Sequence, residues 1–80
     1  MKACEVIAYH SKEGKITPLK IKIYEGDDAS VFVIKSCVEL TQNYRQKDIL
    51  RFRCKITVNE VLREIELIFN KTDMTWFIKE

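Results

Sequence analysis

The sequence predicts an all-β protein, a single small antiparallel barrel of about six strands that spans residues 1–80. Apolar residues recur at every second position, which is the side-chain period of a strand with one buried face. Six such segments follow one another, joined by short polar turns, and eighty residues provide a single core. An SH3-like barrel is the expected topology, and an OB-like barrel or an open meander sheet are the alternatives.

Three strands are expected in the first half of the chain, at residues 2–9, 16–24 and 30–40. Each turn between them holds a glycine, which adopts positive φ without strain. Pro18 cannot donate a backbone hydrogen bond, so it marks the start or an edge of the second strand. The inward positions expected from the alternation are Cys4, Val6, Ala8, Leu19, Ile21, Ile23, Phe32, Ile34 and Val38.

The third of these segments, residues 30–40, differs from the others because it is apolar on both faces. Val31, Val33 and Cys37 occupy the positions that alternate with its inward set. Strands of this kind are usually central in a sheet or covered on both sides. We expect the same of this one.

The firmest structural prediction is a hairpin that spans residues 49–70. A tight two-residue turn sets one register in which apolar residues face each other, while Arg53 faces Glu66 and Lys55 faces Glu64. A shift of one residue would break both faces at once. The inward residues of this hairpin and of the last strand, residues 74–79, are Leu50, Phe52, Cys54, Ile56, Val58, Ile65, Leu67, Phe69, Met74, Trp76 and Ile78.

Composition favours a cytoplasmic protein without a membrane segment. The net charge is +2, which is too small to indicate a dedicated nucleic-acid binder, and no apolar run approaches the length of a membrane helix. The first residues lack the continuous apolar stretch of a signal peptide. Cys4, Cys37 and Cys54 are far apart in the sequence and odd in number, so we expect three reduced thiols that pack as small apolar side chains.

Catalysis finds little support in the sequence. There is one histidine, His10, placed at a turn, and there is no nucleophile motif, phosphate-binding loop or cluster at metal-ligand spacing. The adjacent acids Asp27 and Asp28 are read as solvated turn residues rather than cation ligands. We therefore expect a non-enzymatic binding module with no catalytic residue, cofactor or metal, and we keep an enzyme on a small substrate as a third hypothesis.

The leading hypothesis is binding of a protein partner, or self-association into a homodimer, through an outer apolar and aromatic surface. In a barrel, the residues opposite the core positions face outward, and an exposed apolar patch among them marks an interaction surface. Tyr9 and Phe77 are the residues around which this surface is expected. The alternative is that both faces are buried. The outward apolar set is Ile7, Tyr9, Val33, Ile68 and Phe77.

The alternative function is binding of single-stranded nucleic acid by a small barrel. Such barrels combine a positive groove with aromatic platforms on which bases stack. The candidate residues are Lys20, Lys22, Tyr24, Arg51 and Arg53. Against this hypothesis, the hairpin register places glutamates opposite Arg53 and Lys55, which leaves only Arg51, Lys20 and Lys22 without an expected partner.

Three stretches resemble a family of short, uncharacterised β-domain proteins from clostridia-like Firmicutes. Residues 9–20 resemble its pattern of lysine, acid, glycine, lysine, isoleucine, any residue, proline and leucine. Residues 51–54 resemble a central strand with phenylalanine, arginine and cysteine, and Trp76-Phe77 resembles a C-terminal pair of tryptophan and an aromatic residue. The resemblance implies a bacterial stand-alone β domain of unknown function and provides no site residues.

Overall fold

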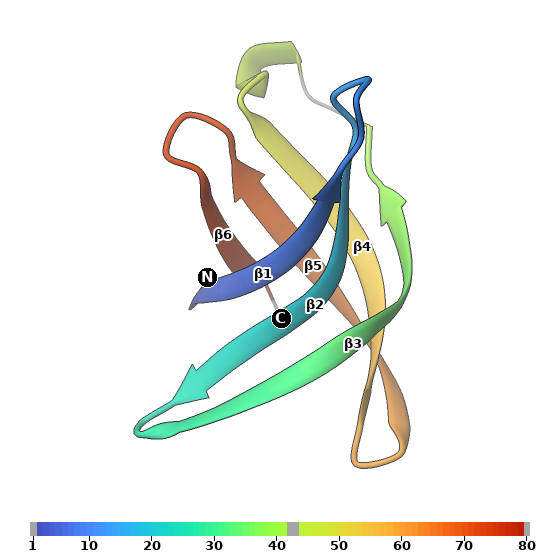
Figure 1. Cartoon of the computed structure of the whole chain (residues 1–80), viewed down its shortest axis with the longest axis vertical. Coiled ribbons are helices and arrows are strands. Elements are labelled where there is room, and N and C mark those ends of the chain that lie inside the picture. Colours follow the sequence, from blue (N-terminus) through green and yellow to red (C-terminus); the bar gives the residue numbers. More distant parts are fainter. Residues whose placement is uncertain (1, 42–43, 80) are drawn as a thin grey trace.

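The structure, a computed structural model that describes residues 2–41 and 44–79, is a closed barrel of six antiparallel strands (Figure 1). Each strand pairs with the next along the chain, and the last pairs with the first. A short 3-10 turn, Tyr44–Gln46, lies in the connection between the third and fourth strands. The strands are β1 Lys2–His10, β2 Ile16–Glu25, β3 Asp28–Glu39, β4 Ile49–Val58, β5 Val61–Asn70 and β6 Thr75–Lys79. The predicted small antiparallel barrel is thus confirmed.

Two strands change partners along their length and form the corners of the barrel. β1 pairs with β6 through residues 2–4 and with β2 through residues 5–10. β3 pairs with β2 through residues 20–25 of that strand, and from Ile34 onward it pairs with β4. A sheet closes in this way when a bend or bulge lets one strand pass from one sheet to the next.

The hairpin of β4 and β5 has the register predicted from the sequence. Cys54 is opposite Ile65, Phe52 is opposite Leu67, and the ladder runs unbroken from Ile49 to Val58. Both turn residues have positive φ, 52° at Asn59 and 66° at Glu60. This is the type I′ pattern, which matches the right-handed twist of paired strands.

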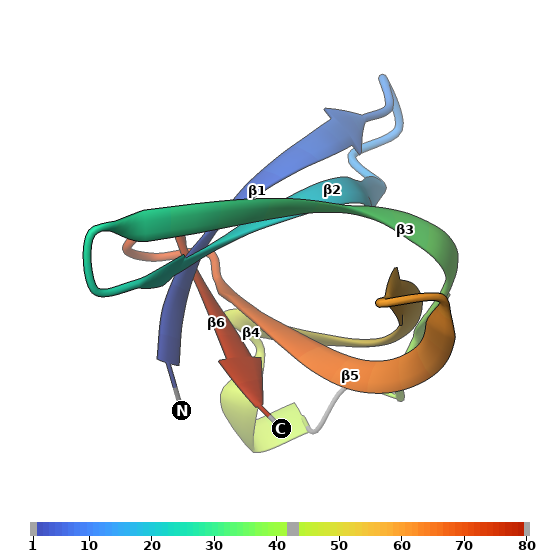
Figure 2. The ribbon, with the colours of Figure 1, turned by 90° about the horizontal axis from the view of Figure 1, so that it is seen from below.

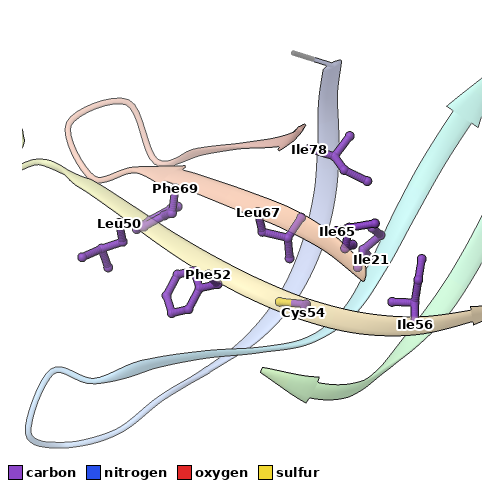
Figure 3. Packing of buried hydrophobic residues seen from close by; sticks show 9 residues of the cluster. All are labelled: Ile21, Leu50, Phe52, Cys54, Ile56, Ile65, Leu67, Phe69 and Ile78. Carbon is purple, nitrogen blue, oxygen red and sulfur yellow. The ribbon is translucent and has the colours of Figure 1, made fainter. Parts of the chain in front are cut away.

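The core lies mainly against β4 and β5, as Figure 3 shows. Trp76 of β6 stacks on this core, with its ring centroid 4.6 Å from that of Phe69 and 5.8 Å from that of Phe52. β1 and β3 contribute only partly buried side chains to it. The buried cluster consists of Ile21, Leu50, Phe52, Cys54, Ile56, Ile65, Leu67, Phe69 and Ile78.

A bulge in β2 makes the prediction for Leu19 wrong. The register passes from Ile7 opposite Lys20 to Ala8 opposite Pro18, so Leu19 is an extra residue without a partner on β1. Pro18 takes the inward position and is buried, whereas Leu19 is 45% exposed. The extra residue shifts the alternation by one, which sequence periodicity alone does not reveal.

A second bulge, in β3, makes the prediction for Val38 wrong. Ile34 is opposite Ile56 but Ser36 is opposite Lys55, so Lys35 is the extra residue. After it the faces exchange: Cys37 points inward opposite Cys54, and Val38 is 63% exposed. Of the two alternatives expected for this strand, the central position is the one observed, because β3 pairs with both β2 and β4. It is not covered on both sides, since its outer face carries exposed valines.

In β6 the outcome is mixed. Trp76 and Ile78 contact the core as predicted. Met74 does not, because it lies in the turn before the strand with φ of 57° and its side chain is exposed. The strand itself begins at Thr75.

Candidate functional site

One end of the barrel is open between the tips of the β2–β3 and β4–β5 hairpins, which diverge in Figures 1 and 2. We call this opening the mouth. Its origin is the change of partner in β3: among the described residues, no strand pairs with β3 residues 28–33 on the side away from β2. On the other side of the same hairpin, β2 residues 23–25 extend beyond the pairing with β1. The distal part of the β2–β3 hairpin is therefore a two-stranded ribbon.

The mouth contains a cavity of about 590 Å³. Its walls come from both hairpins and from the end of β6. The apolar lining residues are Ile23, Phe32, Ile56, Val58, Ile65 and Ile78. The polar lining residues are Glu25, Ser30, Asn59, Arg63 and Glu64. The lining is therefore divided almost evenly between apolar and polar residues, so a ligand in the mouth would meet both kinds of side chain.

The unpaired stretch of β3, residues 28–33, forms one side of the mouth, and we call it the free β3 edge. Ser30 and Phe32 line the cavity, while Val31 and Val33 are 59% and 51% exposed on the outer face. From Ala29 to Ile34 the sequence has no charge, proline or glycine. Natural sheet edges usually carry lysine, proline or a bulge that blocks pairing with another strand. The bulge at Lys35 lies beyond this edge, so the edge itself lacks such protection.

The opposite side of the mouth carries a cationic side chain that faces inward. Arg63 is opposite Ile56 in the β4–β5 ladder, so its side chain projects from the inner face of β5 at the rim of the mouth. Within the described part of the chain, no ion pair involves Arg63. Sequence reasoning missed this residue, although the alternation of β5 already places it in phase with Ile65.

The residues predicted to form an outer binding surface do not lie together. Phe77 is opposite Ala3 of β1 and is partly buried, whereas Tyr9 lies six residues further along β1, roughly 20 Å of strand away. Tyr9, Ile7 and Val33 are exposed as expected. Tyr9 and Phe77 therefore belong to two separate places on the barrel.

The arginines of β4 are engaged by glutamates, but along diagonals of the ladder rather than directly across it. Arg51 donates two hydrogen bonds to the Glu66 carboxylate, from Nε and Nη2, each 3.0 Å long. The second ion pair joins Arg53 and Glu64 at 3.4 Å. The hydrogen bonds to Arg51 lower the pKa of Glu66 and raise that of Arg51.

The expectation that Arg51 lacks a partner and that Lys55 has one is therefore wrong. The register is as predicted, but a long arginine side chain reaches the diagonal neighbour, which lies within its range on a twisted sheet. No ion pair to Lys55 occurs among the residues that the structure describes. The positive charge of Arg51 and Arg53 is largely compensated within the sheet.

The basic residues of β2 form a separate group. The ammonium of Lys22 lies 5.2 Å from the ring centroid of Tyr24, whose hydroxyl donates a 3.1 Å hydrogen bond to Glu5. Contact with Tyr24, followed by the charge of Glu5, raises the pKa of Lys22. Lys20 is opposite Val33, whereas Arg53 is opposite Val38, a separation of about 17 Å along β3. The five residues proposed for nucleic acid thus fall into two groups.

No three histidine, cysteine, aspartate or glutamate side chains gather in a metal-binding arrangement among the described residues. In the same part of the chain, no helix has the length and apolar character needed to span a bilayer. Comparison with protein-family models, with curated proteins and with solved structures finds no match to this chain. The resemblance to short clostridial proteins therefore stays a prediction from sequence motifs.

Proposed function

We propose that this protein is a non-enzymatic interaction module that accepts an extended segment of a partner protein along the free β3 edge. The observation that carries the proposal is the unpaired stretch of β3, uncharged after Asp28, beside the partly apolar mouth. Addition of a strand to an exposed sheet edge is a general mode of peptide recognition.

The chemistry of the edge selects a polypeptide as the ligand. An unpaired strand presents backbone N–H and C=O groups in a row, and only another extended backbone satisfies the whole row at once. Alternate side chains of an added strand would enter the mouth, where Phe32 and Ile23 provide apolar contacts. The intervening side chains would lie beside Val31 and Val33 on the outer face.

The proposal keeps the class of function expected from the sequence but moves the surface. Protein binding or self-association was expected around Tyr9 and Phe77, whereas the cavity and the free β3 edge lie between the two hairpin tips. An SH3-like relationship and a cytoplasmic location in a bacterium stay part of the proposal.

The test is a titration of ¹⁵N-labelled protein with a synthetic peptide that copies residues 28–35 of this chain. This peptide is extended, apolar in its centre and charged at both ends, so it is a suitable probe for strand addition. We expect shifts and slower hydrogen exchange for the amides of residues 28–33. The same peptide with V31P should produce neither effect, because proline removes a backbone donor.

Two protein variants locate the contact. Val31→Lys places a charge beside the free β3 edge and should weaken peptide binding at least tenfold. Leu62→Lys is the matched control, because Leu62 is exposed to a similar degree on β5 and should leave binding unchanged. Absence of any shift in residues 28–33 at millimolar peptide would refute the proposal, as would equal effects of both variants.

A second candidate function is binding of single-stranded nucleic acid. It is supported by the adjacency of Lys20, Lys22 and Tyr24 on β2, with a lysine over the aromatic ring. Fluorescence anisotropy with labelled oligothymidylate at about 50 and 200 mM salt tests it, because phosphate contacts weaken steeply as salt rises. Binding that is lost in Lys20→Gln and Lys22→Gln but kept in Val31→Lys would favour nucleic acid.

A further inference from the structure

Two of the three thiols face each other across neighbouring strands. Cys37 of β3 is directly opposite Cys54 of β4, and the two Sγ atoms are 3.4 Å apart. Both side chains point inward, Cys54 with no exposed surface and Cys37 partly buried. Their proximity is not predicted from the sequence, because they are seventeen positions apart and only the bulge at Lys35 turns Cys37 inward.

The backbone geometry suits a covalent bond between them. Residues directly opposite in an antiparallel ladder have Cα atoms about 4.5–5.5 Å apart. Disulfides join Cα atoms about 4.4–6.8 Å apart, so a bond requires side-chain rotation without movement of the strands.

We propose that Cys37 and Cys54 are an oxidation site, which a hydroperoxide converts into a disulfide between β3 and β4. This inference is independent of the proposed peptide-binding function. It rests on the contact between the two sulfur atoms and on their position in the ladder.

The reaction consists of two displacements. Cys37 reacts first because it is the more accessible thiol: its sulfur attacks one peroxide oxygen, the O–O bond breaks, and the leaving hydroxide takes the thiol proton to form water. The product is a sulfenic acid on Cys37. The sulfur of Cys54 then attacks that of Cys37, the S–O bond breaks, and the second hydroxide leaves as water with the Cys54 proton. Two thiols lose two electrons, and with hydrogen peroxide as the oxidant two waters form.

The environment of the pair makes this reaction slow at neutral pH. Burial raises the pKa of both thiols, and the contact between them raises that of Cys54 further while lowering that of Cys37. The nucleophilic thiolate is therefore scarce, and the oxidation rate should increase with pH. Cys4, whose pKa burial raises to about 11, has no cysteine opposite it, because its ladder partner is Trp76.

The disulfide would change the molecule at a defined place. It ties β3 to β4 just after the bulge at Lys35, on the β4-paired part of the strand that follows the free β3 edge. The cross-link closes a chain segment between two strands, which restricts the unfolded state and stabilises the fold.

The experiment treats purified protein with excess hydrogen peroxide and follows it by intact mass, thiol alkylation and peptide mapping without reductant. We expect a loss of mass equal to two hydrogen atoms, a peptide that links Cys37 to Cys54, and Cys4 still open to alkylation after denaturation. The Tm should rise by roughly 10 °C and return after reduction.

Cys4→Ala is the matched control and should give the same product. Cys37→Ala should keep Cys54 reduced, since a thiol with no exposed surface reacts slowly by itself. Three free thiols after treatment, a linkage that involves Cys4, or sulfinic acid on Cys37 without a bond to Cys54 would each overturn the proposal.

Discussion

The β4–β5 and β2–β3 hairpins are built from strands of similar length, yet they have different roles in the barrel. The β4–β5 ladder is unbroken, holds most of the core on its inner face and carries two ion pairs on its outer face. The β2–β3 hairpin has a bulge in each strand, leaves its neighbours halfway along, and exposes valines outside and a cavity inside. One hairpin stabilises the barrel, and the other provides the candidate binding surface.

The difference follows from how each sequence divides its two faces. In β4, apolar and charged residues alternate without exception from Leu50 to Lys55, so a shifted register would bury charge. In β3, apolar residues occupy both faces. A bulge that swaps the inward and outward faces therefore costs little free energy, because it only puts a valine or a cysteine where another valine would have been. A strand with this freedom can leave its sheet and form an edge.

The largest expected effect contrasts the aromatic residues of the two hairpins. Phe52→Ala removes a side chain that is fully buried and should lower the free energy of unfolding by about 3–5 kcal/mol. Phe32→Ala removes a partly buried side chain at the mouth and should cost less than half as much. Urea denaturation measures both, and equal losses would contradict the division between a core hairpin and a binding hairpin.

A smaller effect is expected at the turns. Gly26, with φ of 62°, has open space where a Cβ would lie, so Gly26→Ala should cost about 1 kcal/mol from backbone strain alone. Glu60 has φ of 66° without being glycine, and Glu60→Gly should stabilise the β4–β5 hairpin by about 0.5 kcal/mol. Thermal unfolding monitored by circular dichroism should show Tm shifts of opposite sign, and shifts of the same sign would refute the turn assignment.

The smallest effect concerns the outer face of β4. Because Arg51 lowers the folded-state pKa of Glu66, the pair contributes stability above the ordinary carboxyl pKa, and this stability is lost as the pH falls through the folded value. Arg51→Gln should raise the pKa of Glu66 and flatten the loss of stability below about pH 4.5. Lys55→Gln should leave the pKa nearly unchanged. A ¹³C NMR titration of the Glu66 carboxyl measures this pKa. Identical pKa values in the wild-type protein and in both variants would exclude the diagonal pair.

The sequence by itself determined the strand class, the number of strands and the whole β4–β5 register, because these follow from local alternation and from the pairing of two adjacent segments. It also predicted that Ile7 and Tyr9 of β1 are exposed, but it placed Leu19 of β2 in the core. The positions of both bulges were decided only by tertiary structure, because barrel closure makes β2 and β3 bend and the extra residue in each strand absorbs that bend. The same closure brings Cys37 to Cys54, keeps Tyr9 apart from Phe77, and leaves the free β3 edge beside the mouth.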